Sequence, residues 1–331
     1  MEFPNGRGQR VSQSGMVPKP RLWQRAMIWA ACNKTLAKRM QANPLTRNLA
    51  RRYVGGADRA EALTCVGRLK EKGLCASLYY LGEYVDTSAL VEQNVEEIIA
   101  SLATFNGVSP SVFFSVDPTQ IGYSVSDVLG RGNAARIAAE SVRHPGIAFI
   151  MLDMEDPSRV EPTIALYHEL RATGVAVAVT LQACLRRTEQ DFECLAKLGA
   201  RIRLVKGAFV AGKDIAWTRK GDIDAAYDRL AQRALSHEMR SSGLYPILAT
   251  HDDRILDRLK PILRVNGWQR HQYEIEMLLG VREPLQVSLA REGHTVRVYV
   301  PFGSEWWAYT ARRIGENPAN ARFVLQALLG R

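Results

Sequence analysis

The chain has 331 residues, of which 47% are hydrophobic, 24% charged and 8% aromatic, and this usage excludes a fibrous or wholly disordered protein. Its five cysteines, an odd number without a C-x-x-C pair, argue against a disulfide framework or a zinc site and favour a reducing cytoplasm. The N-terminus is polar and no apolar run reaches the roughly 18 residues of a membrane span, so neither a signal peptide nor a span is expected.

The net charge of +10 is concentrated at the N-terminus. Residues 1–60 hold 12 basic and two acidic residues, so the rest of the chain is balanced and a nucleic-acid-binding body is not expected. We expect residues 1–20, rich in Gly, Ser, Gln and Pro, to be a disordered tail, and residues 21–60 to form a basic helical arm. The apolar spacing over Leu22–Met40 fits a helix that caps the main domain or one that lies on anionic lipid.

Between residues 61 and 331, short strand-like runs alternate with longer helical segments, the pattern of βα units around a parallel sheet. Eight strands are predicted: Leu74–Leu81, Ser111–Val116, Ala148–Leu152, Val175–Leu181, Arg201–Val205, Tyr245–Ala249, Gln272–Leu278 and Thr295–Val300. Helices are predicted over Val91–Phe105, Ala134–Arg143, Ser158–Ala172, Glu189–Leu198, Ile223–Ser241 and Arg254–Leu263. The sequence therefore predicts an α/β fold, a (β/α)8 TIM-like barrel preceded by the helical arm.

Polar residues follow nearly every predicted strand. They include Glu83, Asp117, Asp153, Gln182 and His251. Barrels of this type build their sites at the carboxyl ends of the strands, whereas an open doubly wound sheet would not place functional groups at nearly all of its strand ends. The pattern favours the barrel and places its site at that end.

The stretch Gly130-Arg131-Gly132-Asn133-Ala134-Ala135 resembles a dinucleotide-binding fingerprint, with Asp153 downstream. No buried strand directly precedes it, so we interpret these glycines as a loop that leads into a helix at Ala134. No histidines have metal-ligand spacing and no G-x-S-x-G motif is present, so neither a metal site nor a serine hydrolase is predicted.

Two basic clusters suggest ligand binding. Arg203, Lys206 and Gly207 end one strand, where cations and a close backbone approach suit a phosphate or a reduced flavin; the alternative is a rim of solvated charges. Arg312 and Arg313 lie in a predicted helix after the last strand, and two guanidinium groups can bind one carboxylate; the alternative is a solvated helix face.

Together these segments resemble the proline dehydrogenase family, FAD-dependent enzymes that oxidise L-proline to Δ1-pyrroline-5-carboxylate. The matching pieces cover about residues 78–320 in family order: Leu81-Gly82-Glu83, Leu152-Asp153-Met154-Glu155-Asp156, Leu181-Gln182-Ala183, Arg203-Leu204-Val205-Lys206-Gly207-Ala208, Ala249-Thr250-His251-Asp252, Tyr273-Glu274 with Met277-Leu278 and Gly280, and the block from Val296 to Asn320. The resemblance implies hydride transfer from C5 of the ring to flavin N5 and a membrane quinone as electron acceptor. The basic arm would then suit peripheral contact with the inner face of the membrane.

The resemblance also implies roles for individual residues. Arg203 is expected beside the flavin N5 and Asp153 at the floor of the site, both as catalytic residues. The expected substrate-binding set is Arg312 and Arg313 for the carboxylate, Glu83 as a gate paired with Arg312, Glu316 in support, and Tyr299, Tyr309 and Leu278 around the ring, with Asp117 in the same pocket. The expected FAD-binding set is Met154, Gln182, Arg203, Lys206, Gly207, Ala208, Thr250 and His251.

Three positions depart from the family pattern. Asp117 stands where the family has a lysine that would pair with Asp153, so we expect two unpaired carboxylates and a raised pKa unless a cation lies between them. Phe209 and Cys184 stand where tyrosine is common.

Oxidation of L-proline or a close analogue is the preferred function. Two alternatives stay open: a family member that acts on another cyclic or cationic amino acid, and a non-catalytic flavin-binding relative.

Overall fold

The computed structural model describes residues 33–43, 46, 50–82, 85, 87–108, 112–207 and 211–316, with the side chains of 34, 35, 38 and 312–316 excepted. The predicted tail and the first part of the predicted arm lie outside the described residues, as do Glu83, Ala208 and Phe209.

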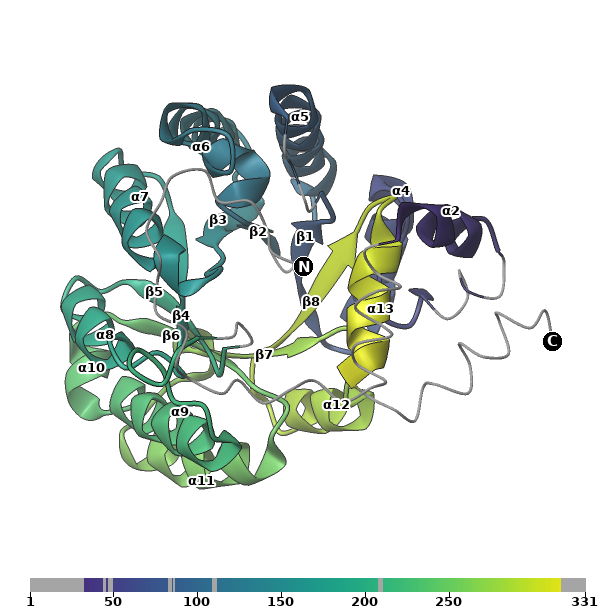
Figure 1. The fold of residues 1–331 in the computed structure, drawn as a ribbon. Helices are drawn as coiled ribbons and strands as arrows, with labels where there is room; N and C mark the ends of the chain where they lie inside the picture. The colour runs from purple at the N-terminus through teal and green to yellow at the C-terminus, as the bar shows by residue number, and fades with distance from the viewer. Residues whose placement is uncertain are drawn as a thin grey trace.

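Parallel strands close into a barrel in which each strand pairs with its neighbour in the chain and β8 pairs with β1 (Figure 1). The strands are β1 (Cys75–Tyr80), β2 (Val112–Val116), β3 (Ile147–Leu152), β4 (Val177–Gln182), β5 (Arg201–Val205), β6 (Tyr245–Ala249), β7 (Glu274–Leu278) and β8 (Val296–Phe302). Every predicted strand is present, with ends that differ by at most two residues. The predicted α/β barrel is confirmed.

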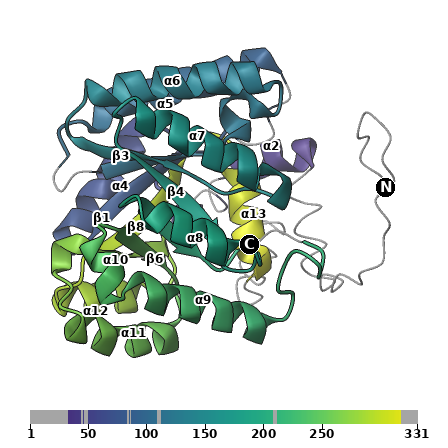
Figure 2. The ribbon, with the colours of Figure 1, turned by 90° about the vertical axis from the view of Figure 1, so that its left-hand side faces the viewer.

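Helices surround the barrel (Figure 2). They are α4 (Arg59–Glu71), α5 (Ser88–Phe105), α6 (Asp127–Val142), α7 (Val160–Ala172), α8 (Thr188–Ala196), α9 (Lys220–Ala234), α10 (His237–Ser241), α11 (Asp253–Val265) and α12 (Glu283–Arg291), with the short turns η1 (Thr119–Tyr123), η2 (Pro157–Arg159) and η3 (Arg270–Gln272). Their apolar faces and the outward side chains of the strands form the main core, in which Leu78, Phe105 and Phe302 are completely buried. Among the described residues, no helix combines the length and apolar character needed to cross a membrane.

The glycine-rich stretch is helical, so its interpretation as a loop is wrong. α6 begins at Asp127, and the Ser126 side chain caps it by accepting a hydrogen bond from the Leu129 amide. A Cβ at Gly130 would collide with the ring of Tyr123, so glycine stands there to let η1 pack closely against the helix. The segment predicted as one helix over residues 223–241 is two helices, because the chain breaks after Ala234 and Ser236 caps a new turn.

The last described helix, α13 (Trp306–Glu316), lies over the carboxyl ends of β1 and β8. Its residues Trp306, Trp307 and Tyr309 share one buried cluster with Tyr79 and Leu81. α2 (Lys34–Ala42) packs against α13, while α4 contacts the outer side of β8 and β1 (Figure 1). The chain thus carries its final helix to the end of the barrel where sites of this fold are built.

Candidate active site

The barrel interior begins, at the amino ends of the strands, with a buried ion pair. Arg297 Nε and Nη2 each donate to Glu274 at 2.6 Å, and Arg297 Nη1 donates to the carbonyl of Ala76 at 2.6 Å. Tyr245 adds a hydroxyl donor to Glu274 at 2.9 Å, and its pKa is raised by burial and by the Glu274 charge. Both charges are about 95% buried in side-chain terms, so this layer closes the barrel below the site.

One layer higher, Arg203 occupies the centre of the barrel. Its Nη1 lies 3.3 Å from Glu276 Oε2 and 3.2 Å from Ser115 Oγ, and its Nε donates to Thr180 Oγ1 at 3.0 Å. Ser77 donates to the other oxygen of Glu276 at 2.5 Å. Strand side chains alternate in direction, so residues two apart on β7, Glu274 and Glu276, project into successive layers.

The top layer lies at the carboxyl ends of the strands. Arg203 Nη2 forms an ion pair with Asp153 Oδ1, and the other oxygen of Asp153 accepts from the Tyr299 hydroxyl at 3.1 Å. Burial, with a smaller effect from the Asp117 charge, raises the pKa of Tyr299 well above its ordinary value. The Tyr299 hydroxyl therefore stays protonated and remains a donor to Asp153.

Asp117 joins this layer through Tyr79. The Tyr79 hydroxyl donates to Asp117 Oδ2 at 2.6 Å, and the rings of Tyr79 and Tyr299 are stacked with centroids 5.7 Å apart. The expectation of two unpaired carboxylates is therefore wrong, since Asp153 pairs with Arg203 and Asp117 is hydrogen-bonded by Tyr79. Arg203 is also no solvated rim charge, because it is only 4% exposed and is held by two carboxylates.

A second group of polar side chains follows β4, β5 and β6. Gln182 Nε2 donates to the Glu155 carbonyl at 2.6 Å and more weakly to that of Met154 at 3.3 Å. Lys206 pairs with Asp224 at 2.6 Å and with Asp252 at 3.1 Å. Burial opposes ionisation of Asp252, but the hydrogen bond and charge of Lys206 outweigh it and lower the pKa of Asp252.

The loop after β6 is attached to the end of β7. His251 Nε2 accepts from the Leu278 amide at 3.0 Å, so a neutral imidazole carries its proton on Nδ1. Thr250 is buried, and its hydroxyl accepts from the Asp252 amide at 3.2 Å. Both residues are thereby fixed at the same end of the barrel as Lys206.

Gly207 shapes the turn after β5. Its φ of +95° is a backbone conformation that L side chains rarely adopt, and a Cβ there would collide with Cys184 Sγ and lie 2.9 Å from Gln182 Oε1. The Cys184 thiol is buried, which raises its pKa. Gly207 thus lets the backbone of the β5 exit approach the β4 exit closely.

Comparison with known proteins identifies the family. The sequence model described as Proline dehydrogenase matches residues 62–326. The chain belongs to the proline dehydrogenase family. It is 36% identical over 304 residues to the proline dehydrogenase of Deinococcus radiodurans, across 89% of this chain and 96% of that protein. It is 34% identical over 302 residues to proline dehydrogenase 1 of Bacillus subtilis (strain 168), across 91% and 97%. The predicted family and the predicted enzyme class, an oxidoreductase of the proline dehydrogenase type, are confirmed.

Solved structures with a similar fold come from larger proteins. Proline utilization A (PutA) from Bdellovibrio bacteriovorus, inactivated by N-propargylglycine, gives a TM-score of 0.74 at 19% identity over 90% of this chain and 39% of that chain. PutA from Corynebacterium freiburgense gives 0.68 at 23% identity over 92% and 34%. These similarities support the barrel fold, and this chain spans well under half of either protein.

Within this proline dehydrogenase family member, the structure brings together Asp153, Arg203, Tyr299 and Asp117. Tyr309 is buried on α13 beside them, in the cluster against which Tyr299 packs. The α13 helix includes the backbone of residues 312–316, whereas the side chains of Arg312, Arg313 and Glu316 lie outside the described part of the chain.

Sequence reasoning missed the residues that hold Arg203 in place. These are Glu276, Ser77, Ser115 and Thr180, all at most 3% exposed. A usable signal was the alternation Glu274-Ile275-Glu276, because two acids at period two in an apolar strand indicate charges that point into a barrel.

The family implies a flavin cofactor. The residues at the β4, β5 and β6 ends fit an anionic flavin nucleotide by their chemistry. Arg203 and Lys206 supply cationic N–H donors, and Gln182 and Thr250 supply polar groups on rigid strand ends. His251 adds an imidazole fixed by the end of β7.

Proposed function

We propose that this protein catalyses FAD-dependent oxidation of L-proline to Δ1-pyrroline-5-carboxylate by hydride transfer from C5, with electrons passed on to a quinone. The observation that carries the proposal is the buried Arg203, Asp153 and Tyr299 cluster at the barrel mouth of a proline dehydrogenase family member. The flavin supplies the hydride acceptor when it is bound. The protein's own task is to hold substrate and cofactor in a reactive geometry and to answer the developing charge.

Arg203 is the residue proposed to meet the negative charge that develops on the reduced cofactor. Its guanidinium is buried and held by Asp153, Glu276 and Thr180, so it requires little reorganisation during the reaction. Tyr299 fixes Asp153 from the opposite side through its hydroxyl. A rigid, desolvated cation of this kind is worth more to a reaction than a mobile one at the surface.

The substrate is proposed to bind between this cluster and α13. Arg312 and Arg313 would bind its carboxylate, with Glu83 as a gate to Arg312 and Glu316 in support. Tyr299, Tyr309 and Leu278 would enclose the pyrrolidine ring. In support, Tyr309 and Trp307 of α13 are buried in one cluster with Tyr79, which brings this helix to the mouth of the barrel.

The cofactor is proposed to be held by Met154, Gln182, Arg203, Lys206, Gly207, Ala208, Thr250 and His251. The described members of this set occupy the ends of four neighbouring strands, β3 to β6. Lys206 would contribute a phosphate contact in addition to its ion pairs with Asp224 and Asp252. Gly207 would allow the cofactor close access to the backbone.

A second candidate substrate is an amino acid with an additional positive group. It is favoured by the position of Asp117, whose charge adds to that of Asp153 around the Tyr299 hydroxyl. Replacement D117K should then raise proline turnover and reduce turnover of the cationic substrate. Unchanged selectivity would count against this candidate.

The deciding experiment is an anaerobic absorption spectrum of the purified protein before and after addition of L-proline. A flavin spectrum that bleaches supports proline oxidation. A flavin spectrum that proline leaves unchanged, but a cationic amino acid bleaches, supports the second candidate. A flavin that no amino acid reduces would favour a non-catalytic relative, and absence of flavin would overturn the cofactor assignment.

We further propose that the protein works in the cytoplasm with peripheral contact to the inner face of the membrane, where a quinone would accept its electrons. The basic N-terminal segment supports this proposal, because anionic lipid attracts clustered Lys and Arg. Removal of residues 1–32 deletes basic residues and keeps the sequence of α2. If vesicle cosedimentation does not change on this truncation, the basic residues of segment 1–32 make no contribution to membrane contact.

A further inference from the structure

A crevice on the outer side of the barrel lies between α4, α12 and the loop that follows β7. It has a volume of about 130 Å³, and Arg51, Arg52, Arg68 and Lys72 line it against a single carboxylate, Glu283. Its inner wall is apolar and includes Leu69 and Leu74, which are at most 5% exposed. Cations beside an apolar wall attract an anion more strongly than cations surrounded by water.

The ion pairs around the crevice leave positive charge unbalanced. Lys72 Nζ lies 3.5 Å from Glu283, and Arg51 lies 3.6 Å from Glu61. Among the described residues, Arg52 and Arg68 pair with no carboxylate; Arg52 lies over the ring of Tyr53, and Arg68 contacts the Cys65 thiol. Two guanidinium groups therefore remain available to a ligand.

The backbone holds this arrangement in place. A Cβ at Gly280 would collide with the carbonyl of Arg52, so the segment that carries the arginines packs tightly on the loop after β7. Tyr53 and Val54, which follow, are buried, and Gly55 donates to the Pro301 carbonyl at 2.8 Å. The basic groups thus project from an anchored segment.

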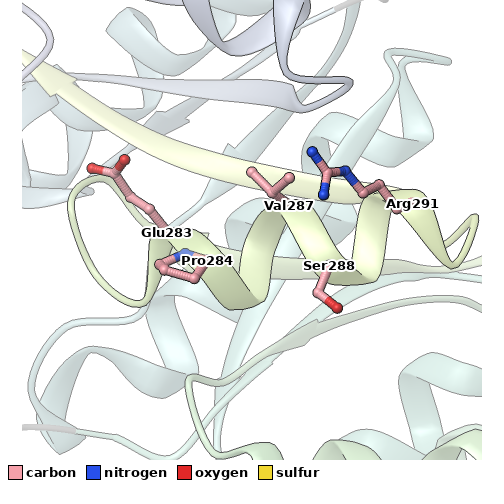
Figure 3. Close-up of a pocket in the computed structure, with 5 residues that line it drawn as sticks. All are labelled: Glu283, Pro284, Val287, Ser288 and Arg291. Atoms are coloured by element: carbon pink, nitrogen blue, oxygen red, sulfur yellow. The ribbon is translucent and has the colours of Figure 1, made fainter.

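The crevice continues into a shallow, mostly apolar depression along α12. Pro284 and Val287 line it between Glu283 and Arg291 (Figure 3), it has a volume of about 440 Å³, and it shares Glu283 and Val287 with the crevice. A free phosphate would use only the crevice. A phospholipid would place its headgroup among the arginines and its apolar part along the depression.

We propose that the α4–α12 crevice binds a phosphate group, and that its source is the headgroup of an anionic phospholipid. The inference gives the proposed membrane contact a defined site on the barrel. It does not depend on proline being the substrate.

The test uses the full chain with its flavin and vesicles of phosphatidylcholine with or without phosphatidylglycerol. The variant R52Q/R68Q should bind phosphatidylglycerol vesicles at least about 10-fold more weakly than the parent, because each basic residue near an anionic surface contributes measurably. The control R143Q/R264Q removes the same charge from exposed positions outside the crevice and should lose less than about 3-fold. Equal losses in the two variants, or no loss in R52Q/R68Q, would overturn the site.

Inorganic phosphate separates the two sources of the ligand. Saturable broadening of its 31P signal that R52Q/R68Q abolishes, together with unchanged vesicle binding, would assign the crevice to a soluble phosphate and overturn the lipid. Flavin bleaching by L-proline, measured alongside, should be the same in parent and variants. Failure of the parent to bleach would count against the proposed function and leave the vesicle result standing.

Discussion

Arg203 Nη1 lies 3.3 Å from Glu276 Oε2 at the centre of the barrel, and one layer below it Arg297 pairs with Glu274 at 2.6 Å. Both acids come from β7 and are about equally buried. The upper pair is connected to Asp153 through Arg203, and Asp153 in turn accepts from Tyr299. We therefore expect the Arg203–Glu276 pair to support the site and the Arg297–Glu274 pair to support the stability of the fold.

Replacement E276Q should slow flavin reduction by L-proline about 10-fold or more with little change in KM. The amide keeps the shape of the side chain but loses the charge that holds Arg203, and a hydrogen bond to a charged group is worth about 1.5–3 kcal/mol. Stopped-flow absorbance under anaerobic conditions measures this rate. We class Glu276 as a positioning residue.

The matched control is E274Q. It should lower the free energy of unfolding by about 3 kcal/mol, because it leaves the buried Arg297 charge uncompensated, while the reduction rate of folded flavoprotein stays unchanged. Denaturant unfolding and the same stopped-flow assay report both quantities. If the two variants differ only in stability, the positioning role of Glu276 is wrong.

Replacement Y299F should reduce the rate of flavin reduction about five-fold. It removes a donor to Asp153 worth about 1 kcal/mol and leaves the ring stacked on Tyr79. Because burial raises the pKa of Tyr299 well above 10, parent and variant should show the same pH dependence up to about pH 9. An alkaline limb present only in the parent would contradict this assignment.

Replacement G207A should destabilise the protein by about 1–3 kcal/mol and weaken flavin retention. Alanine is strained at a φ of +95°, and its Cβ would meet Cys184 Sγ. The double variant G207A/C184A removes the collision with Cys184 Sγ but keeps the close approach to Gln182 Oε1 and the backbone strain, so it should recover only part of the loss. Thermal unfolding and the flavin-to-protein absorbance ratio check both variants. Full recovery would show that strain at Gly207 is unimportant.

Stability should fall on the acid side through the carboxylates that pair with Lys206. Burial opposes ionisation of both groups, but Lys206 and Lys220 outweigh it at Asp224 and Lys206 outweighs it at Asp252, so both pKa values are lowered in the folded protein. Their stabilising contribution is therefore present at neutral pH and is lost as pH falls below about 4 through the folded pKa values. In D252N, the fall in melting temperature between neutral and acid pH should be smaller than in the parent. If the melting temperatures of parent and variant fall in parallel with pH, Asp252 does not contribute to the loss of stability in acid.

The sequence by itself determined the βα alternation, the strands to within two residues and the polar groups at their carboxyl ends, because these features are set by local periodicity and by the alternation of side chains along a strand. The same reliance on local pattern explains the wrong prediction of a loop around Gly130. Glycine is common in loops, but Gly130 is helical and lets Tyr123 pack against the helix.

The tertiary structure decided which charges meet. Arg203 and Glu276 are 73 residues apart in the chain, and Asp117 and Tyr79 are 38 apart, so no periodicity in the sequence could pair them. Closing the barrel fixes the register of β5 against β7 across its interior, and only then does the glutamate become the partner of the arginine.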